Sequence, residues 1–194
     1  TYYYEESPVN LTVHHYLEGT ETSLADDEIS SKYKGDNYET SAKSELLDRY
    51  DLIEDLTTVS PETAGTSGVI NENTVVTYYY KLKEYKITTK VNPVTVTKFN
   101  ENTQQSEEVT LKGGTISGEN DIVYEVVSHG NTSTKEIKAI PDNGYSVNKI
   151  TINGTEIEFT RQADGSVVLE QFENVVEDKE VVVEFIPLQG NLVI

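Results

Sequence analysis

The sequence predicts a mainly β protein with an α+β first module and an all-β, sandwich-like second module, arranged in tandem. Three observations support this prediction. The large apolar residues are Val, Ile, Leu and Tyr without any Met or Trp, only one segment has a helical pattern, and the phrase TYYY occurs at both 1–4 and 77–80. Because a tandem protein repeats its strand phrases, we expect residues 1–8 to be the tail of a preceding repeat. The modules are then 1–84 and 85–194.

The first module is predicted to run strand, strand, helix, strand, strand. VNLTVHHYL (9–17) alternates, and after a Gly-bearing turn TSLA (22–25) is expected to return as the second arm of a hairpin. YDLIEDL (50–56) indicates a short strand, and a long turn-rich loop precedes the last strand, TVVTYYYKLK (74–83).

The helix is predicted over TSAKSELLDRY (40–50). Thr40 or Ser41 would cap it. Ala42, Leu46 and Tyr50 follow one another at four-residue spacing, which places them on one helix face. One helix across a small mixed sheet is an α+β plan.

After residue 84 the helical signal disappears. Short β runs alternate with turn phrases rich in Gly, Asn and Asp, as expected for a sandwich or a related all-β domain. The runs are YKITTKV, VTVTKF, EEVTL, DIVYEVV, TKEIKAI, VNKITIN, TEIEFT, SVVLEQF and KEVVVEFI, and the turns are KGGTISGEN, SHGNTS, PDNGYS, NGTE and ADGS.

Charge and composition exclude several classes of function. A net charge of −19 repels a phosphate backbone and an anionic membrane surface, so we expect no nucleic-acid partner. No apolar run approaches the roughly 20 residues of a membrane span, so no membrane insertion is expected. The chain has no Cys, which excludes disulfides and thiolate chemistry. We expect a monomeric fragment of a longer protein, whose targeting segments lie outside it.

The first module resembles the MucBP (mucin-binding protein) domain of Gram-positive surface proteins. The resemblance covers residues 9–82 and lies in LTVHHYLEGTE, YKGDNYETSAKSELLDRYDLIE and AGTSGVINENTVVTYYYK. It implies a ubiquitin-like β-grasp fold and a role in an adhesin. The family's Gly, Tyr and alternating-strand positions correspond to Gly35, Tyr38, Tyr50, Gly65, Val76, Tyr78 and Tyr80.

The second module is similar to bacterial surface repeats related to the internalin-type B repeats. The similarity covers residues 109–187 and lies in KEIKAIPDNGYSVNKITINGTEIEF and LEQFENVVEDKEVVVEF. Together the two resemblances imply an extracellular location on a bacterial cell surface, attached to the cell wall in the full-length protein. They do not carry over any binding residues, so the binding site is unknown from the sequence.

The tyrosines of the last strand allow two interpretations. Strand alternation directs Val76, Tyr78, Tyr80 and Leu82 towards the core, and Thr77, Tyr79 and Lys81 towards solvent. Core packing is the simpler interpretation, and a sugar-stacking platform is the alternative.

The sequence predicts no metal site and no cofactor. His14 and His15 must face opposite sides of a strand, and His129 lies in a turn. Acidic clusters at 26–28, 118–121 and 176–180 lack the spacing of a calcium loop, although so acidic a surface should attract cations.

No catalytic residues are predicted, and we expect the chain not to be an enzyme. GTSG (65–68) does not form a nucleophile elbow, and small two-layer modules seldom provide a cleft for paired carboxylates. An internal Lys–Asn isopeptide crosslink could involve Lys98 and Glu184, but a charged strand edge explains both residues equally well.

Two functions remain open. The chain is either a non-catalytic module pair that binds mucin or host glycoprotein glycans weakly and multivalently, or a structural spacer that projects a distal adhesive domain from the cell wall. Stacking and hydrogen bonding at short range would have to carry any recognition of anionic mucin, because long-range attraction is missing.

Overall fold

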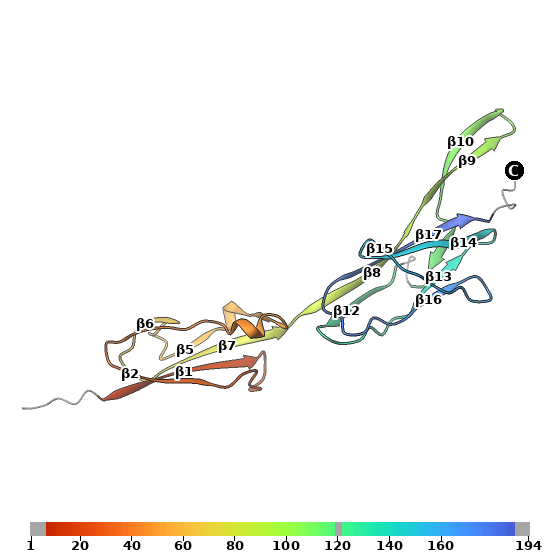
Figure 1. Cartoon of the computed structure of the whole chain (residues 1–194). Helices are drawn as coiled ribbons and strands as arrows, with labels where there is room; N and C mark the ends of the chain where they lie inside the picture. The colour runs from red at the N-terminus through yellow and green to blue at the C-terminus, as the bar shows by residue number, and fades with distance from the viewer. Residues whose placement is uncertain (1–6, 119–121, 189–194) are drawn as a thin grey trace, which may run out of the picture. The chain divides into compact units, whose positions relative to one another are not determined.

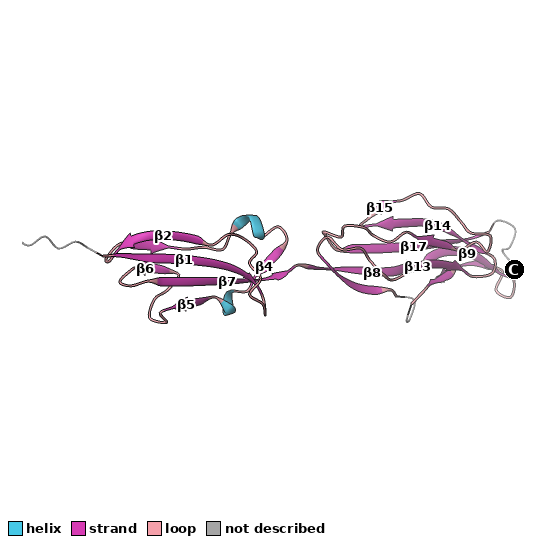
Figure 2. Cartoon of the chain, turned by 90° about the horizontal axis from the view of Figure 1, so that it is seen from below, coloured by secondary structure: helices cyan, strands magenta, loops and turns pink. Residues whose placement is uncertain are grey.

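The protein is mainly β, as the sequence predicts (Figures 1 and 2). The computed structural model describes residues 7–118 and 122–188. The chain divides into two compact units, Thr1–Lys83 (unit 1) and Glu84–Ile194 (unit 2). The predicted repeat tail at residues 1–8 falls almost entirely outside the described residues. None of the helices in the described part of the chain is long and apolar enough to cross a membrane.

Unit 1 is built on a five-stranded mixed sheet in the order β2-β1-β7-β4, with β5 also paired to β7. The first and last of its strands, β1 and β7, are parallel neighbours at the centre. A separate two-stranded sheet joins β3 to β6. The strands are β1 (Pro8–Leu17), β2 (Glu28–Tyr33), β3 (Asn37–Glu39), β4 (Tyr50–Leu52), β5 (Thr58–Ser60), β6 (Ser67–Val69) and β7 (Thr74–Leu82).

Alternation along β1 and β7 determines which side chains form the core of unit 1. The buried set contains aromatic and polar residues as well as aliphatic ones, because Tyr and His occupy core-facing positions of both strands. Its apolar members are Val9, Leu11, Val13, Tyr38, Leu46, Ile70, Val76, Tyr78 and Tyr80. The predicted inward face of β7 is confirmed for Val76, Tyr78 and Tyr80. Thr77, expected at the surface, is buried because His14 of β1 and Thr58 of β5 flank it.

The predicted helix at 40–50 is wrong. The segment holds only a 3-10 turn, η1 (Ser44–Leu46), and a second turn, η2 (Glu54–Leu56), follows β4. The N–H groups of Leu46, Leu47 and Arg49 bond to carbonyls three residues back, as in a 3-10 turn, and not four residues back. Tertiary partners hold the start of the segment: the Thr40 N–H donates to Thr66 O (2.9 Å), and the Lys43 N–H donates to the Tyr80 hydroxyl (2.9 Å). Since a helix this short is marginal in isolation, these outside bonds decide the conformation.

The second hairpin arm is also misplaced in the prediction. Residues 22–25 make only an isolated bridge, Tyr16↔Ser23, and the strand that pairs with β1 is β2, which begins at Glu28. β2 is an edge strand with almost every residue exposed, so it lacks the alternating hydrophobicity that marks a half-buried strand.

The described residues of unit 2 form three sheets. A five-stranded sheet runs in the order β12-β8-β17-β14-β15, a three-stranded sheet in the order β11-β13-β16, and β9 and β10 form a hairpin of their own. The strands are β8 (Glu84–Asn92), β9 (Val94–Asn100), β10 (Gln105–Leu111), β11 (Gly114–Ile116), β12 (Tyr124–Ser128), β13 (Ile137–Pro141), β14 (Tyr145–Ile152), β15 (Thr155–Glu156), β16 (Val167–Leu169) and β17 (Lys179–Pro187).

One aliphatic core joins the two larger sheets of unit 2. Its buried members are Ile87, Ile116, Val123, Val127, Ile137, Ala139, Val147, Ile150, Val167, Val175, Val181, Val183 and Phe185. Gly114 allows the sheets to approach, because a Cβ there would lie 2.6 Å from a ring carbon of Phe185.

Two strand predictions in unit 2 need correction. Residues 114–116, expected within a turn phrase, form β11 against β13. The run at 155–160 pairs with β14 for only two residues, Thr155 and Glu156. The tight turn before it contains Asn153 and Gly154, both with positive φ (49° and 80°).

Candidate functional site

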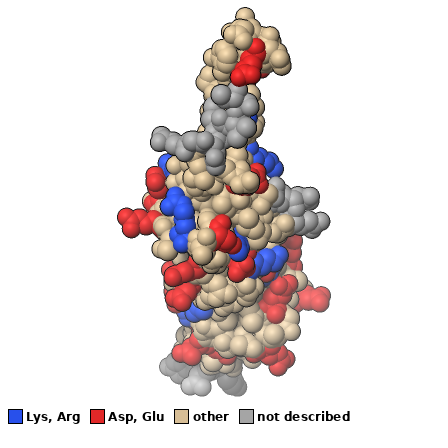
Figure 3. All heavy atoms as spheres, turned by 90° about the vertical axis from the view of Figure 1, so that its right-hand side faces the viewer, with Lys and Arg blue, Asp and Glu red and all other residues tan. Residues whose placement is uncertain are grey.

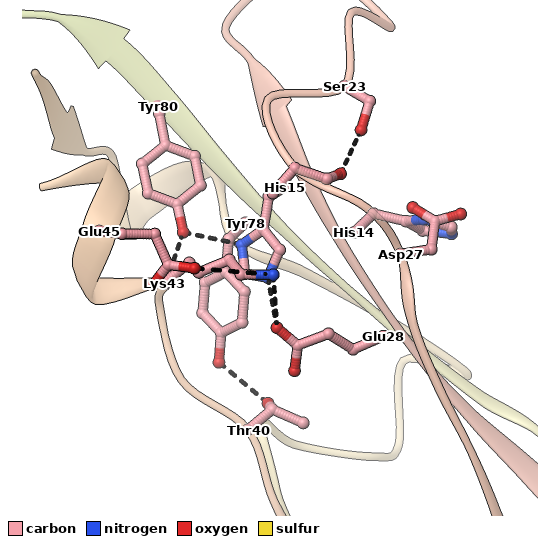
Figure 4. A network of polar contacts seen from close by, with 11 residues as sticks. His14, His15, Ser23, Asp27, Glu28, Thr40, Lys43, Glu45, Tyr78 and Tyr80 are labelled. Carbon is pink, nitrogen blue, oxygen red and sulfur yellow. Dashed lines mark hydrogen bonds and ion pairs between the residues drawn. The ribbon is translucent and has the colours of Figure 1, made fainter.

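The parallel β1–β7 pair carries ionisable and aromatic side chains on both of its faces. Alternation directs His15 into the core and His14 to the outer face, as predicted (Figure 4). The two faces form separate clusters with different properties.

The core cluster is a polar network around His15, whose side chain has 0% exposure. The Tyr80 hydroxyl lies 2.8 Å from His15 Nδ1 and accepts the Lys43 backbone N–H at 2.9 Å (Figure 4). With one acceptor site already used, the hydroxyl satisfies both neighbours when it donates its proton to Nδ1. The ring proton of neutral His15 is then on Nε2, which has no hydrogen-bond partner among the described residues.

Three charged groups lie near the Nε2 side of this ring. The Glu28 carboxylate is 3.5 Å from Nε2 and 3.3 Å from Lys43 Nζ, and Glu45 lies 4.0 Å from that ammonium. Burial lowers the pKa of His15 because it disfavours the imidazolium; the opposing attraction of Glu28 is weaker. Burial likewise raises the pKa of Tyr80. The network is therefore neutral at His15 near pH 7 and fills the core.

The outer cluster consists of His14, Tyr16 and Tyr79, which we call the aromatic ledge. The His14 and Tyr16 rings stack with centroids 5.2 Å apart and planes 13° apart. Tyr16 pairs with Tyr79 in register, and their rings meet edge to face at 6.3 Å. All three side chains are partly exposed. The ledge is thus a connected aromatic surface on two central strands.

Carboxylates border the ledge. Asp27 Oδ1 lies 2.7 Å from His14 Nδ1, which fixes the imidazole against Tyr16. Partial desolvation, with the negative charges of Asp27 and Glu21, raises the pKa of Tyr16. The Tyr16 hydroxyl therefore keeps its proton and can act as a hydrogen-bond donor. Flat aromatic surface beside polar donors and acceptors is suited to stacking a sugar ring and bonding its hydroxyls.

The acidic cluster at 176–180 is held by lysines and a backbone donor. In the 176–180 cluster, Glu177 pairs with Lys179 (2.6 Å) and Glu180 with Lys90 (2.8 Å), while Asp178 accepts a backbone N–H. The cluster at 118–121 lies mostly outside the described residues. Within the described ranges no group of three or more His, Asp or Glu side chains could hold a metal ion.

The other candidate residues are dispersed. Lys98 lies opposite Glu107 in the β9–β10 hairpin, whereas Glu184 belongs to the five-stranded sheet and accepts from Asn148 (2.6 Å) and Asn92 (3.4 Å). The structure thus places the two conceivable members of a Lys–Asn crosslink site, the lysine and the carboxylic acid, in different sheets. The His129 ring packs against Tyr85 at 5.9 Å.

Sequence reasoning missed the ledge. It weighed the tyrosines of the last strand but not Tyr16, and it assigned Asp27 to an acidic cluster. The signal that could have found the ledge is strand alternation. His14 and Tyr16 alternate with core residues of β1, and Tyr79 alternates with core residues of β7, so all three belong to the outer faces of their strands.

Comparison with known proteins found no matching family model and no matching curated protein. The MucBP and internalin-type resemblances therefore stay predictions.

Proposed function

We propose that the chain is a non-catalytic module pair of a bacterial cell-surface adhesin, and that the aromatic ledge binds mucin or glycoprotein glycans weakly. The observation that carries this proposal is the ledge itself: two tyrosines and a histidine in ring contact, partly exposed, on adjacent central strands. Rigid amphipathic rings provide contact area at low entropic cost, which suits a weak stacking site.

The strand order of unit 1 supports its assignment as a β-grasp module. Its first and last strands lie side by side and parallel in the middle of a mixed sheet, as in that fold. The helix that crosses the sheet in the fold is reduced to the single turn η1. Tyr38, one of the motif residues, closes the core by donating its hydroxyl to Gly65 O at 2.6 Å.

Charge limits the ligand. Acidic side chains are spread over the face drawn in Figure 3, with Lys and Arg between them. A chain of net charge −19 gains nothing from long-range attraction to sialylated or sulfated glycans. Binding through the ledge should therefore be weak for one copy and depend on multivalency, because tethered copies raise the effective concentration.

To test the proposal, beads that each carry many copies of the chain are passed over immobilised mucin, and the fraction of beads retained is measured. We expect Tyr16→Ala and Tyr79→Ala each to reduce retention at least several-fold, because each substitution removes one stacking face. Tyr124→Ala, at an exposed tyrosine of unit 2, is the matched control and should leave retention unchanged. Equal retention of all three variants and the wild type would refute the ledge as the binding surface. Wild-type retention no greater than that of an unrelated acidic protein would refute it as well.

The spacer function is the second candidate. It is favoured by the covalent connection between the units, since only Lys83 separates the end of β7 from the start of β8. A spacer needs no ligand, so loss of mucin binding would leave it standing.

A further inference from the structure

Both units use the same strand arrangement at their ends. In unit 1 the first strand, β1, pairs in parallel with the last strand, β7, from Leu11↔Thr74 to Leu17↔Tyr80. In unit 2 the first strand, β8, pairs in parallel with the last strand, β17, from Ile87↔Lys179 to Asn92↔Glu184. The two units differ in sheet number and strand order, yet they share this feature.

The arrangement determines how a pull along the chain acts on each unit. In a parallel pair, the start of the first strand and the end of the last strand lie at opposite ends of the ladder. Tension applied there slides one strand along the other, so it loads all the inter-strand hydrogen bonds together. Tension applied at one end of the same ladder instead breaks the bonds one after another.

The four strands of these two parallel pairs are all interior strands of their sheets, which adds to their resistance to being pulled apart. β1 lies between β2 and β7, and β7 has β4 and β5 on its other side. β8 lies between β12 and β17, and β17 lies between β8 and β14. Releasing β1, β8 or β17 breaks two ladders, and releasing β7 breaks three, whereas an edge strand would leave after breaking one.

Side chains also bridge both pairs. In unit 1 the buried His15–Tyr80 hydrogen bond (2.8 Å) joins β1 to β7, and Tyr16 contacts Tyr79 on the outer face. In unit 2 Lys90 Nζ of β8 lies 2.8 Å from Glu180 of β17. These contacts must break when the strands slide.

We propose that each unit is a shear clamp that bears tensile load along the polypeptide. The β1–β7 pair carries the load through unit 1, and the β8–β17 pair carries it through unit 2. This function does not depend on glycan binding at the ledge, and it holds for either of the two functions proposed above.

Single-molecule force spectroscopy on the full chain, with handles fused to its two ends, tests the proposal. Two unfolding steps are expected, with contour gains of roughly 250 Å for unit 1 and roughly 350 Å for unit 2 before the folded extents are subtracted. The absence of native cysteine lets thiol handles be placed elsewhere on the same chain as matched controls.

The controls pull each pair from one end of its ladder. Ser7→Cys with Glu72→Cys loads β1 and β7 at their starts, and Glu84→Cys with Glu177→Cys does the same for β8 and β17. All four positions are exposed, so we expect unchanged urea midpoints. Rupture forces several-fold lower than those for end-to-end pulling support the clamp. Equal or higher forces in these controls overturn it, and the two units give two independent trials.

Discussion

Units 1 and 2 hold their terminal strands in the same way but fill their cores differently. The core of unit 1 contains His15 with Tyr38, Tyr78 and Tyr80, and buried hydroxyls find partners such as Thr40 and Gly65 O. Among the described residues of unit 2, the buried apolar core is Val, Ile and Ala around a single Phe185. The comparison indicates that a parallel terminal pair can rest either on a hydrogen-bonded core or on an aliphatic one. The two cores should therefore respond differently to truncation, to loss of a hydroxyl and to pH.

The largest effect is expected from truncating the unit 2 core. Phe185→Ala removes a fully buried aromatic ring from that core and leaves a cavity beside Gly114, which should cost about 4 kcal/mol of unfolding free energy. Hydrogen-exchange mass spectrometry on peptides from each unit measures the loss. Phe99→Ala, in the exposed β9–β10 hairpin, is the control and should be nearly neutral. A similar loss of unfolding free energy in both variants would show that the aliphatic core is not the main source of stability in unit 2.

A hydroxyl deletion should affect unit 1 more than its volume change implies. Tyr80→Phe leaves His15 Nδ1 and the Lys43 N–H without their shared partner, at a cost of about 2 kcal/mol. Tyr79→Phe removes a hydroxyl from the outer face and should change the urea midpoint very little. If the two variants unfold at the same urea concentration, the polar network contributes nothing to the stability of unit 1.

Acid should weaken unit 1 before unit 2. Burial holds the pKa of His15 below 6.5, so between the folded pKa and pH 6.5 the native state binds fewer protons than the unfolded state. The stability that unit 1 gains from neutral His15 is therefore complete only above about pH 6.5. It then declines as pH falls from there towards the folded pKa. His15→Gln, which does not titrate, should flatten the decline in exchange protection of β1, whereas the matched His14→Gln should keep it. An unchanged pH profile in His15→Gln would assign the decline to other groups.

The sequence predicted strands well where both faces had a distinct environment. β1, β7, β8 and β17 appear within one or two residues of their expected bounds, because their alternation records a buried and an exposed side. The exposed edge strand β2 and the short β11 carried no such record and were missed. The helix at 40–50 had the right spacing, but Thr66, Tyr80 and β7 hold the two ends of the segment, and the residues between them form only a 3-10 turn.

The amino-acid sequence by itself determined the β class, the inward face of β7 and the opposite orientations of His14 and His15, because each follows from local periodicity. Only the tertiary structure decided that β1 pairs with β7 and β8 with β17, that the 40–50 segment forms a turn, and that Tyr16 meets Tyr79. Each of these depends on partners dozens of residues away, and an alternating pattern specifies which face a side chain takes but not which strand lies beside it.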